Sequence, residues 1–252
     1  MWYLIPLFLC WGSFLNVIAY RLIHDLSFKE SRSICPSCHH AINWYDLLPI
    51  ISWIMLKRRC RHCQQPISLL YPLIELLTAI SLFGMTHYII PTYWPIYFIF
   101  ISALIITIRT DLETMQISRL VTLCLIPLPI IASLTFYSSY PLIPLRLSSV
   151  LLGASFGYFV LWLINKLFFW YAKQDGMGQG DLDLLATIGA FTGLTGAWFS
   201  LVIGSISGAT AGLILIGLRR SPTNHLLPFG PFLALGALIF IFFQDKLLNL
   251  FF

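Results

Sequence analysis

Hydrophobic residues gather in long runs separated by short polar segments, and this pattern predicts a helical membrane protein. A helix needs about 20 mainly apolar residues to cross the hydrocarbon core of a bilayer. The runs that approach or meet this length are 1–20, 67–90, 94–109, 118–137, 147–171, 182–195, 197–218 and 229–251. We therefore expect an all-α polytopic membrane protein with about eight transmembrane helices.

Two of these runs raise questions of their own. The run 1–20 has no basic segment before it and no small-residue cleavage site after it, so we interpret it as a retained first span rather than a signal peptide. The run 182–195 is short, and it is either a full span followed by a turn at 192–196 or a re-entrant segment.

Charge supports the membrane interpretation and orients the chain. Charged residues are only 10% of the 252 residues and hydrophobic residues are 58%, whereas soluble domains carry roughly 25% charged residues. With the N-terminus outside, the inner segments hold Arg21, Lys29, Arg32, Lys57, Arg58, Arg59, Arg61, Arg109, Arg119, Lys166, Lys173, Arg219 and Arg220. The outer segments hold Arg146 and Lys246.

This asymmetry follows the positive-inside rule and predicts that the long loop, 21–66, faces the cytoplasm. The net charge of +5 is then a signal of topology and of affinity for anionic membrane lipids. We expect no nucleic-acid partner.

The long loop carries two Cys-x-x-Cys pairs, which predict a zinc site. Cys35 and Cys38 form the first pair, and Cys60 and Cys63 form the second. Disulfides are rare in the reducing cytosol, and two such pairs supply a tetrahedral set of four thiolates. Four protein ligands leave no open position for a substrate, so the predicted zinc is structural. Metal binding would then contribute much of the folding free energy of this small loop.

Two acidic clusters lie at predicted span ends and suggest a catalytic pair. Asp111 follows the third apolar run, and Asp181 follows the glycines Gly176, Gly178 and Gly180. In the predicted topology both aspartates lie at the cytoplasmic rim, where ionisable groups are costly and usually functional. Two close carboxyl groups share a proton, so one can activate water while the other donates a hydrogen bond to a peptide carbonyl. The glycines would permit close approach and unusual backbone angles in the loop.

Each aspartate taken singly has a simpler interpretation as a helix cap. Glu113 and Asp183 each lie two positions beyond the favoured aspartate and would face elsewhere on a helix. Asp175 is interpreted as a solvated loop charge. Glu75 lies inside the second apolar run, where it is either a functional group or a helix-to-helix hydrogen-bonding group.

Several ordered motifs resemble those of the type IV prepilin peptidases, the leader peptidase/N-methyltransferases among the Gly-x-Gly-Asp membrane aspartic peptidases. They are Gly12–Val17 with Tyr20 and Arg21, the two cysteine pairs, Asp46–Pro49, Ser52 and Trp53, Arg59 and Cys60, Tyr71–Glu75, Asp111, Gly176–Asp181 and Pro228–Ala234. The resemblance covers nearly the whole chain, and it implies that Asp111 and Asp181 are the catalytic residues.

The resemblance also implies two activities. One is cleavage of the short basic leader of type IV prepilins or type II secretion pseudopilins on the cytoplasmic side. The other is methylation of the new N-terminus with S-adenosylmethionine as the methyl donor. The corresponding domain organisation is a first span at 1–20, a zinc-binding and methyltransferase region at 21–66 and a peptidase domain at 67–252.

The chain departs from the family pattern at two places. The first aspartate motif usually continues with Ile-Pro or Leu-Pro and a polar residue, whereas here it continues with Ile117, Ser118 and Arg119. The second motif usually has a lysine where this chain has Asp183. An extra acid there could perturb the protonation of the pair, bind the basic leader or weaken catalysis.

Other classes of protein also fit parts of the pattern. A different Gly-x-Gly-Asp intramembrane protease would share the aspartates but not the cysteine module. A metal or proton transporter could use Asp111 and Asp181 as ligands or relays, although transporters usually place such groups near the bilayer midplane. A catalytically inactive membrane scaffold is the remaining alternative.

Overall fold

The computed structural model describes residues 2–27, 33–135, 146–218 and 227–251. These residues form two compact units, Met1–Thr110 and Asp111–Phe252, and each is described by itself. Lys29, Arg32, Arg219 and Arg220, which contribute to the predicted orientation, lie outside the described residues.

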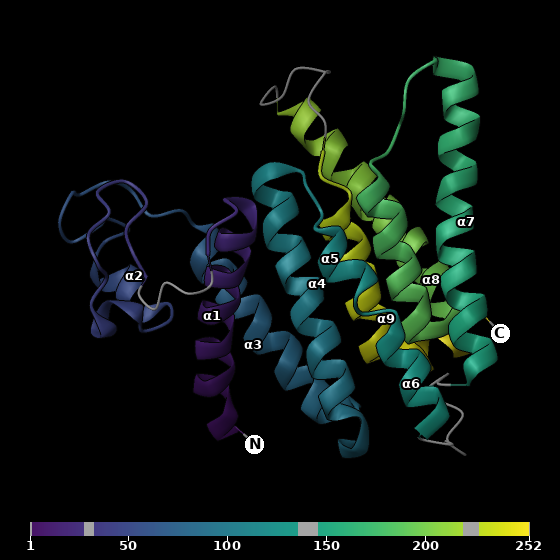
Figure 1. Cartoon of the computed structure of the whole chain (residues 1–252), viewed down its shortest axis with the longest axis horizontal. Helices are drawn as coiled ribbons and strands as arrows, with labels where there is room; N and C mark the ends of the chain where they lie inside the picture. Colours follow the sequence, from purple (N-terminus) through teal and green to yellow (C-terminus); the bar gives the residue numbers. More distant parts are fainter. Residues whose placement is uncertain (1, 28–32, 136–145, 219–226, 252) are drawn as a thin grey trace. The chain divides into compact units, whose positions relative to one another are not determined.

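The first unit is built on three long helices and a loop segment. The long helices are α1 (Ile5–Ile23), α3 (Leu70–Tyr88) and most of α4 (Trp94–Thr114). The short elements are η1 (Trp2–Leu4), η2 (Trp44–Leu47), α2 (Ile51–Met55) and η3 (Pro91–Tyr93). In Figure 1, α1 and α3 lie side by side, and α2 belongs to the loop segment between them in sequence.

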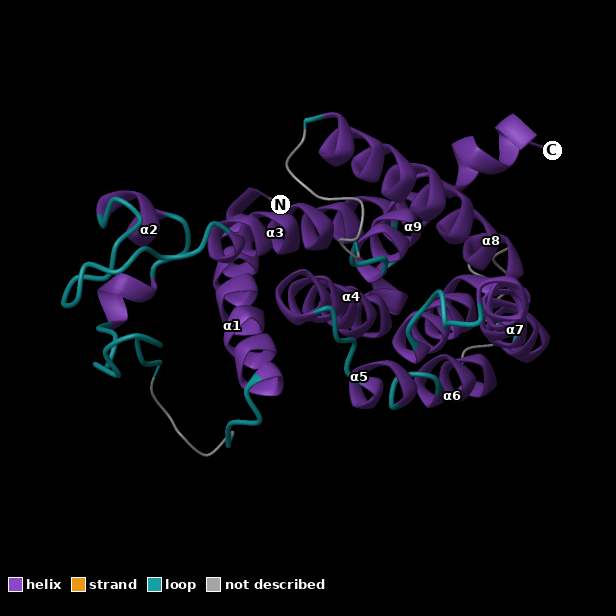
Figure 2. Cartoon of the chain, turned by 90° about the horizontal axis from the view of Figure 1, so that it is seen from above, coloured by secondary structure: helices purple, strands orange, loops and turns teal. Residues whose placement is uncertain are grey.

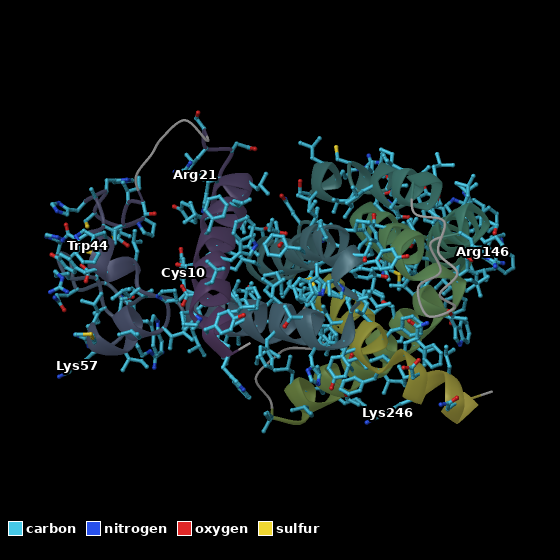
Figure 3. The ribbon with its side chains drawn as sticks, turned by 90° about the horizontal axis from the view of Figure 1, so that it is seen from below. Cys10, Arg21, Trp44, Lys57, Arg146 and Lys246 are labelled. Carbon is cyan, nitrogen blue, oxygen red and sulfur yellow. The ribbon has the colours of Figure 1, made fainter. Side chains whose placement is uncertain are left out.

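Close packing holds the helices of the first unit together. A methyl group on Gly12 of α1 would lie 2.8 Å from the Glu75 Cα of α3, so only glycine allows this approach. Trp11 of α1 donates its indole N–H to the Ser102 hydroxyl of α4 across 2.9 Å. Cys10, labelled in Figure 3, is exposed on α1.

The second unit contains the C-terminal end of α4 and five further helices. These are α5 (Arg119–Leu123), α6 (Pro127–Thr135), α7 (Leu147–Ala172), α8 (Gln179–Gly217) and α9 (Gly230–Phe251). Helix α8 packs against α7 on one side and α9 on the other, while α5 and α6 lie against α7 and α8 (Figures 1 and 2). Arg146 lies at the N-terminal end of α7 (Figure 3).

Small residues make these contacts close. A methyl group on Gly153 of α7 would collide with the backbone of Gly189 in α8, and one on Gly157 would collide with the backbone of Leu185. On the other side, the Ser200 hydroxyl of α8 donates to the Leu233 carbonyl of α9 across 2.7 Å. Without a hydrophobic driving force between helices in lipid, such backbone proximity and hydrogen bonding hold a bundle together.

Among the described residues, six helices are long and apolar enough to cross a membrane: 2–23, 70–88, 91–114, 147–172, 179–217 and 230–249. The region expected to be a continuous span at 118–137 is divided into α5 and α6 over its described residues, and its apolar helical stretch, Arg119–Leu134, is shorter than those six helices. Proline explains the division, since Pro127 has no backbone N–H and begins the second helix.

The two runs expected at 182–195 and 197–218 form one element, α8, which Gly193 interrupts. Gly193 has φ 72° and ψ −176°, a backbone conformation that residues other than glycine rarely adopt. The interruption falls inside the turn predicted at 192–196. Helix α4 continues beyond the predicted end at residue 109, so Asp111 lies in its last turn.

Candidate active site and metal centre

The four loop cysteines converge on one point, as the sequence predicted. The sulfur atoms of Cys35, Cys38, Cys60 and Cys63 all lie within 4.8 Å of one another. The Sγ atoms of Cys35 and Cys63 are 3.9 Å apart. A tetrahedral zinc ion with Zn–S bonds of about 2.3 Å separates its sulfurs by about 3.8 Å, so the cluster has the chemistry and size for zinc.

Two matching turns build this cluster. In the first, Cys35 receives the N–H of His39 at its carbonyl (2.9 Å) and donates its own N–H to the His40 carbonyl (3.0 Å). In the second, Cys60 makes the same pair of bonds with Gln64 and Gln65, at 3.1 and 2.9 Å. His39 and Gln64 both have positive φ, 55° and 59°. The structure thus reveals a short internal repeat that the sequence analysis did not detect, because the two turns share little beyond their cysteines.

Polar contacts attach the rest of the loop to this centre. The Arg61 guanidinium binds Asp46 with two hydrogen bonds of 3.0 and 2.7 Å, and it lies 5.4 Å from the centre of the Tyr45 ring. Arg58 lies 5.3 Å from the centre of the Trp53 ring. Arg58 and Arg61 are therefore both held by side chains of the loop itself.

Glu75 connects the loop to α3. Its Oε2 accepts the backbone N–H of Ile50 across 2.8 Å, and the Ser13 hydroxyl of α1 also donates to this carboxylate. Glu75 is 6% exposed. Sequence reasoning proposed a functional or helix-to-helix role, and the structure shows that it also holds the loop.

The first predicted catalytic residue, Asp111, is buried at the end of α4. It is 4% exposed, and its Oδ2 accepts the backbone N–H of Gly230 across 3.0 Å. Gly230 is the first residue of α9. Amides at a helix N-terminus have no partner within the helix and carry partial positive charge, so they are favourable partners for a carboxylate.

The second predicted catalytic residue, Asp181, is half-buried in the first turn of α8. Its backbone N–H donates to the Gly178 carbonyl across 3.2 Å. Its carboxylate lies within the range of electrostatic interaction with Asp111. The structure therefore brings the two predicted acids into one site within the second unit.

Ile117 packs against glycines of α8 and α9 that lie next to the two acids. A methyl group on Gly180 would lie 2.7 Å from Ile117 Cβ, and one on Gly230 would lie 2.9 Å from Ile117 Cδ1. Gly180 precedes Asp181 in the chain, and Gly230 binds Asp111. The side chain of Ile117 therefore acts as a spacer that contacts the neighbours of both carboxylates.

The glycines of the loop have different roles from those predicted. Among the described glycines only Gly193 has a positive φ, so the loop glycines are not needed for unusual backbone angles. Gly180 is required for the approach of Ile117, and Gly176 for that of Phe168, whose ring would lie 2.7 Å from a methyl group. A methyl group at Gly178 would meet Asp181 Oδ2 at 3.8 Å, an ordinary contact.

Sequence reasoning missed a residue that shapes this loop. Asn165 of α7 accepts the backbone N–H groups of Gly176 and Met177 through its Oδ1, at 2.9 and 3.2 Å. It also donates to Asp175 across 3.4 Å. Asn165 lies in a mainly apolar helix, where a side-chain amide is a signal that the sequence did offer.

Glu113 and Asp183, the rejected alternatives, lie apart from the pair of acids in different ways. Glu113 is exposed on the last turn of α4. Asp183 is 2% exposed and forms an ion pair with Arg119, with Nε and Oδ2 2.9 Å apart. Asp183 is therefore a buried structural charge rather than a solvent-facing acid.

The fold and the two centres define a class: helical multi-pass membrane proteins that carry a four-cysteine centre and, in a separate unit, two neighbouring aspartates. Residues 7–89 match the Bacterial Peptidase A24 N-terminal domain. Residues 98–213 match the Type IV leader peptidase family.

Curated relatives extend this match over most of the chain, and those below are each named prepilin leader peptidase/N-methyltransferase. The relative from Aeromonas hydrophila is 32% identical over 94% of this chain and 88% of its own length. Those from Burkholderia pseudomallei (strain 1026b) and Legionella pneumophila are 33% and 31% identical, over 92% and 94% of this chain and 82% and 89% of their own lengths. No solved structure matches the chain. The chain belongs to the Type IV leader peptidase family.

Proposed function

We propose that the protein is a membrane aspartic endopeptidase that removes the basic leader of type IV prepilins or type II secretion pseudopilins. The observation that carries the proposal is the pairing of Asp111 and Asp181 within one unit, where Ile117 contacts Gly180 next to Asp181 and Gly230 next to Asp111. The relatives named above supply the substrate class.

In the proposed reaction the two carboxyl groups share one proton. The ionised carboxylate accepts a proton from water, and the water oxygen attacks the scissile carbonyl carbon. The protonated carboxyl group donates a hydrogen bond to the carbonyl oxygen. Collapse of the tetrahedral intermediate then breaks the C–N bond, and a proton passes to the departing amine. The Gly230 N–H holds Asp111 in a fixed orientation during these steps.

The membrane arrangement in this proposal has eight spans in the bacterial inner membrane, with the acids at the cytoplasmic rim. Helix α8 has 39 residues and is about 58 Å long at about 1.5 Å per residue, nearly twice the thickness of a hydrocarbon core. Its interruption at Gly193 supports two spans rather than one. The distribution of lysine and arginine supports the orientation.

A second activity, N-methylation of the new N-terminus, is supported by the names of the relatives. S-adenosylmethionine is the proposed methyl donor. We assign this activity to the region 21–66, which follows the first span at 1–20 and precedes the peptidase domain at 67–252. The zinc that the four cysteines would hold is structural in this scheme, because four thiolates leave no open coordination position.

Membrane lipids are the proposed partner of the loop's apolar surface. Ile51, Ile54 and Met55 of α2 are 55%, 62% and 75% exposed, and Trp44 is 79% exposed. Figure 3 labels Trp44 and Lys57 on this segment. Exposed apolar and aromatic side chains beside lysine and arginine are typical of segments that lie in the membrane interface.

The test is a cleavage assay with purified protein and a prepilin peptide that spans the Gly–Phe junction after the leader. We expect Asp111→Asn and Asp181→Asn each to abolish cleavage, whereas Glu113→Gln, which alters an exposed acid on the same turn of α4, retains it. Full activity in either aspartate variant would remove the proposed pair. A product heavier by one methyl group, in the presence of S-adenosylmethionine, would establish the second activity.

A further inference from the structure

The ion pair between Arg119 and Asp183 joins the two parts of the chain that carry the acids. Arg119 is the first residue of α5, and Asp183 follows Asp181 by two positions in α8. The Asp183 side chain is 3% exposed and that of Arg119 is 58% exposed. A buried carboxylate without a partner is strongly unfavourable, so Asp183 holds Arg119, and with it the start of α5, against α8.

The segment between Asp111 and α5 is fixed at several points. It begins with Met115, which has φ 56° and donates its N–H to the Asp111 carbonyl across 2.9 Å. Ile117 then fills the space in front of Gly180 and Gly230. Beyond Arg119, the Thr187 hydroxyl of α8 donates to the Thr122 carbonyl of α5 across 3.0 Å. The segment 111–122 therefore bridges the end of α4 and the start of α8.

The same contact joins the two departures from the family pattern. Arg119 stands where a polar residue is usual, and Asp183 stands where a lysine is usual. Because the two side chains bind each other, the acid at 183 is neutralised by the cation at 119. Asp183 is also too deeply buried to meet a basic leader, which removes one of the roles considered from the sequence.

We propose that Arg119 and Asp183 are positioning residues: their ion pair fixes Ile117 and thereby sets the distance between the carboxyl groups of Asp111 and Asp181. This inference rests on the proposed peptidase function. A displacement of about 1 Å between reacting groups can lower a rate by about 100-fold, so loss of the pair alters turnover. Substrate affinity depends on other contacts and changes little.

The experiment is a charge-reversal cycle on the full-length protein in lipid nanodiscs. Arg119→Asp and Asp183→Lys each place like charges in contact, and the double variant restores an opposite pair with the signs exchanged. We expect each single variant to lower kcat by about 10- to 100-fold with little change in KM, and the double variant to recover to within about 3-fold of wild type. Arg119→Lys retains the charge and most of the activity.

Two controls separate positioning from folding. Arg146→Asp reverses an exposed charge at the N-terminal end of α7, the opposite end from the Gly176–Asp181 loop, and leaves kcat unchanged. Thermal unfolding of each variant shows whether the protein folds. The kcat values of all variants are then compared at a temperature below the lowest unfolding midpoint.

The outcomes are distinguishable. Recovery in the double variant supports the inference. Folded single variants with wild-type kcat would overturn it while leaving the peptidase function intact, and so would a double variant no better than either single variant. If the wild-type protein fails to cleave the leader peptide, the proposed function and this inference both fail.

Discussion

Gly230 and Asp111 lie so close together that a methyl group on Gly230 would be 2.8 Å from Asp111 Oδ2. The first turn of α9 thus forms one wall of the site around Asp111. This approach depends on the absence of a side chain at residue 230, because the same methyl group would also press on Ile117 at 2.9 Å.

Gly230→Ala is expected to displace Asp111 and Ile117 and to lower kcat by about 10-fold or more, since crowding of a packed site forces side chains from their preferred positions. Gly217→Ala is the matched control, because a methyl group there meets nothing within 4 Å. Leader cleavage by both variants is the measurement. Equal activity of Gly230→Ala and Gly217→Ala would contradict the close packing of Gly230 against Asp111 and Ile117.

Asn165→Ala removes the acceptor for two backbone N–H groups of the Gly176–Asp181 loop. We expect the loop to lose its fixed conformation and kcat to fall by about 10-fold, with stability lowered by about 1–2 kcal/mol. Asn165→Asp keeps an acceptor oxygen and should retain more activity than the alanine variant. The reverse order would show that the amide's donor function, toward Asp175, is the important one.

Glu75→Leu leaves the Ile50 N–H without its acceptor and should free the loop from α3. The cost expected for the unpaired group is about 1–3 kcal/mol. Limited proteolysis between residues 33 and 67 measures the effect, with faster cleavage predicted for the variant. Glu75→Gln, which keeps a carbonyl oxygen, provides the comparison, and its loop should resist the protease nearly as well as wild type.

Loss of one zinc ligand should unfold the loop. Cys35→Ser is expected to lower bound zinc to a small fraction of one ion per chain and to expose the loop to proteolysis, because metal binding supplies folding free energy. Cys10→Ser, which alters an exposed cysteine of α1, should leave the zinc content unchanged. The measurement is the zinc content per chain of the purified proteins. A Cys35→Ser protein with full zinc would rule out the four-sulfur site.

If the two cysteine turns persist when a chelator removes the zinc, the free thiols should react unequally. Hydrogen bonds from the backbone of Cys63 and His62 lower the pKa of the Cys60 thiol to about 7. A hydrogen bond from the Gln65 backbone acts in the same direction at Cys63, but loss of hydration and the neighbouring thiols outweigh it and raise the pKa of Cys63 to about 11. Since the thiolate is the reactive form, alkylation of Cys60 should rise steeply as the pH passes 7, well before Cys63 reacts. Mass mapping of labelled peptides across this pH range tests the order.

Local patterns predicted the parts of this molecule that depend on local chemistry. The four cysteines could be assigned from their spacing, because two Cys-x-x-Cys pairs in one loop have few other uses. The apolar runs predicted α7 within one residue at its C-terminal end. Asp111 and Asp181 could be selected because charges at the rim of a membrane helix are rare.

The errors come from features that local patterns do not contain. The break between α5 and α6 was missed because both sides are apolar, and Pro127 was not given enough weight. The contacts of Asp183 with Arg119 and of Asp111 with Gly230 join residues far apart in the chain. The pattern of hydrophobic positions predicts local elements and contains no information about such contacts. The repeat in the cysteine loop is one of backbone hydrogen bonds, and its side chains differ.

The interruption of α8 at Gly193 has a consequence for the geometry of the whole second unit. The half of α8 before Gly193 carries Asp181 in its first turn and packs on α7, whereas the half after Gly193 packs on α9, whose first residue, Gly230, lies beside Asp111. The interruption at this one residue therefore lies between the half of α8 that carries Asp181 and the half that packs on the helix beside Asp111. A change in the backbone angle at Gly193 would alter the angle between these two halves, so the spacing of the carboxylates depends in part on a residue remote from them.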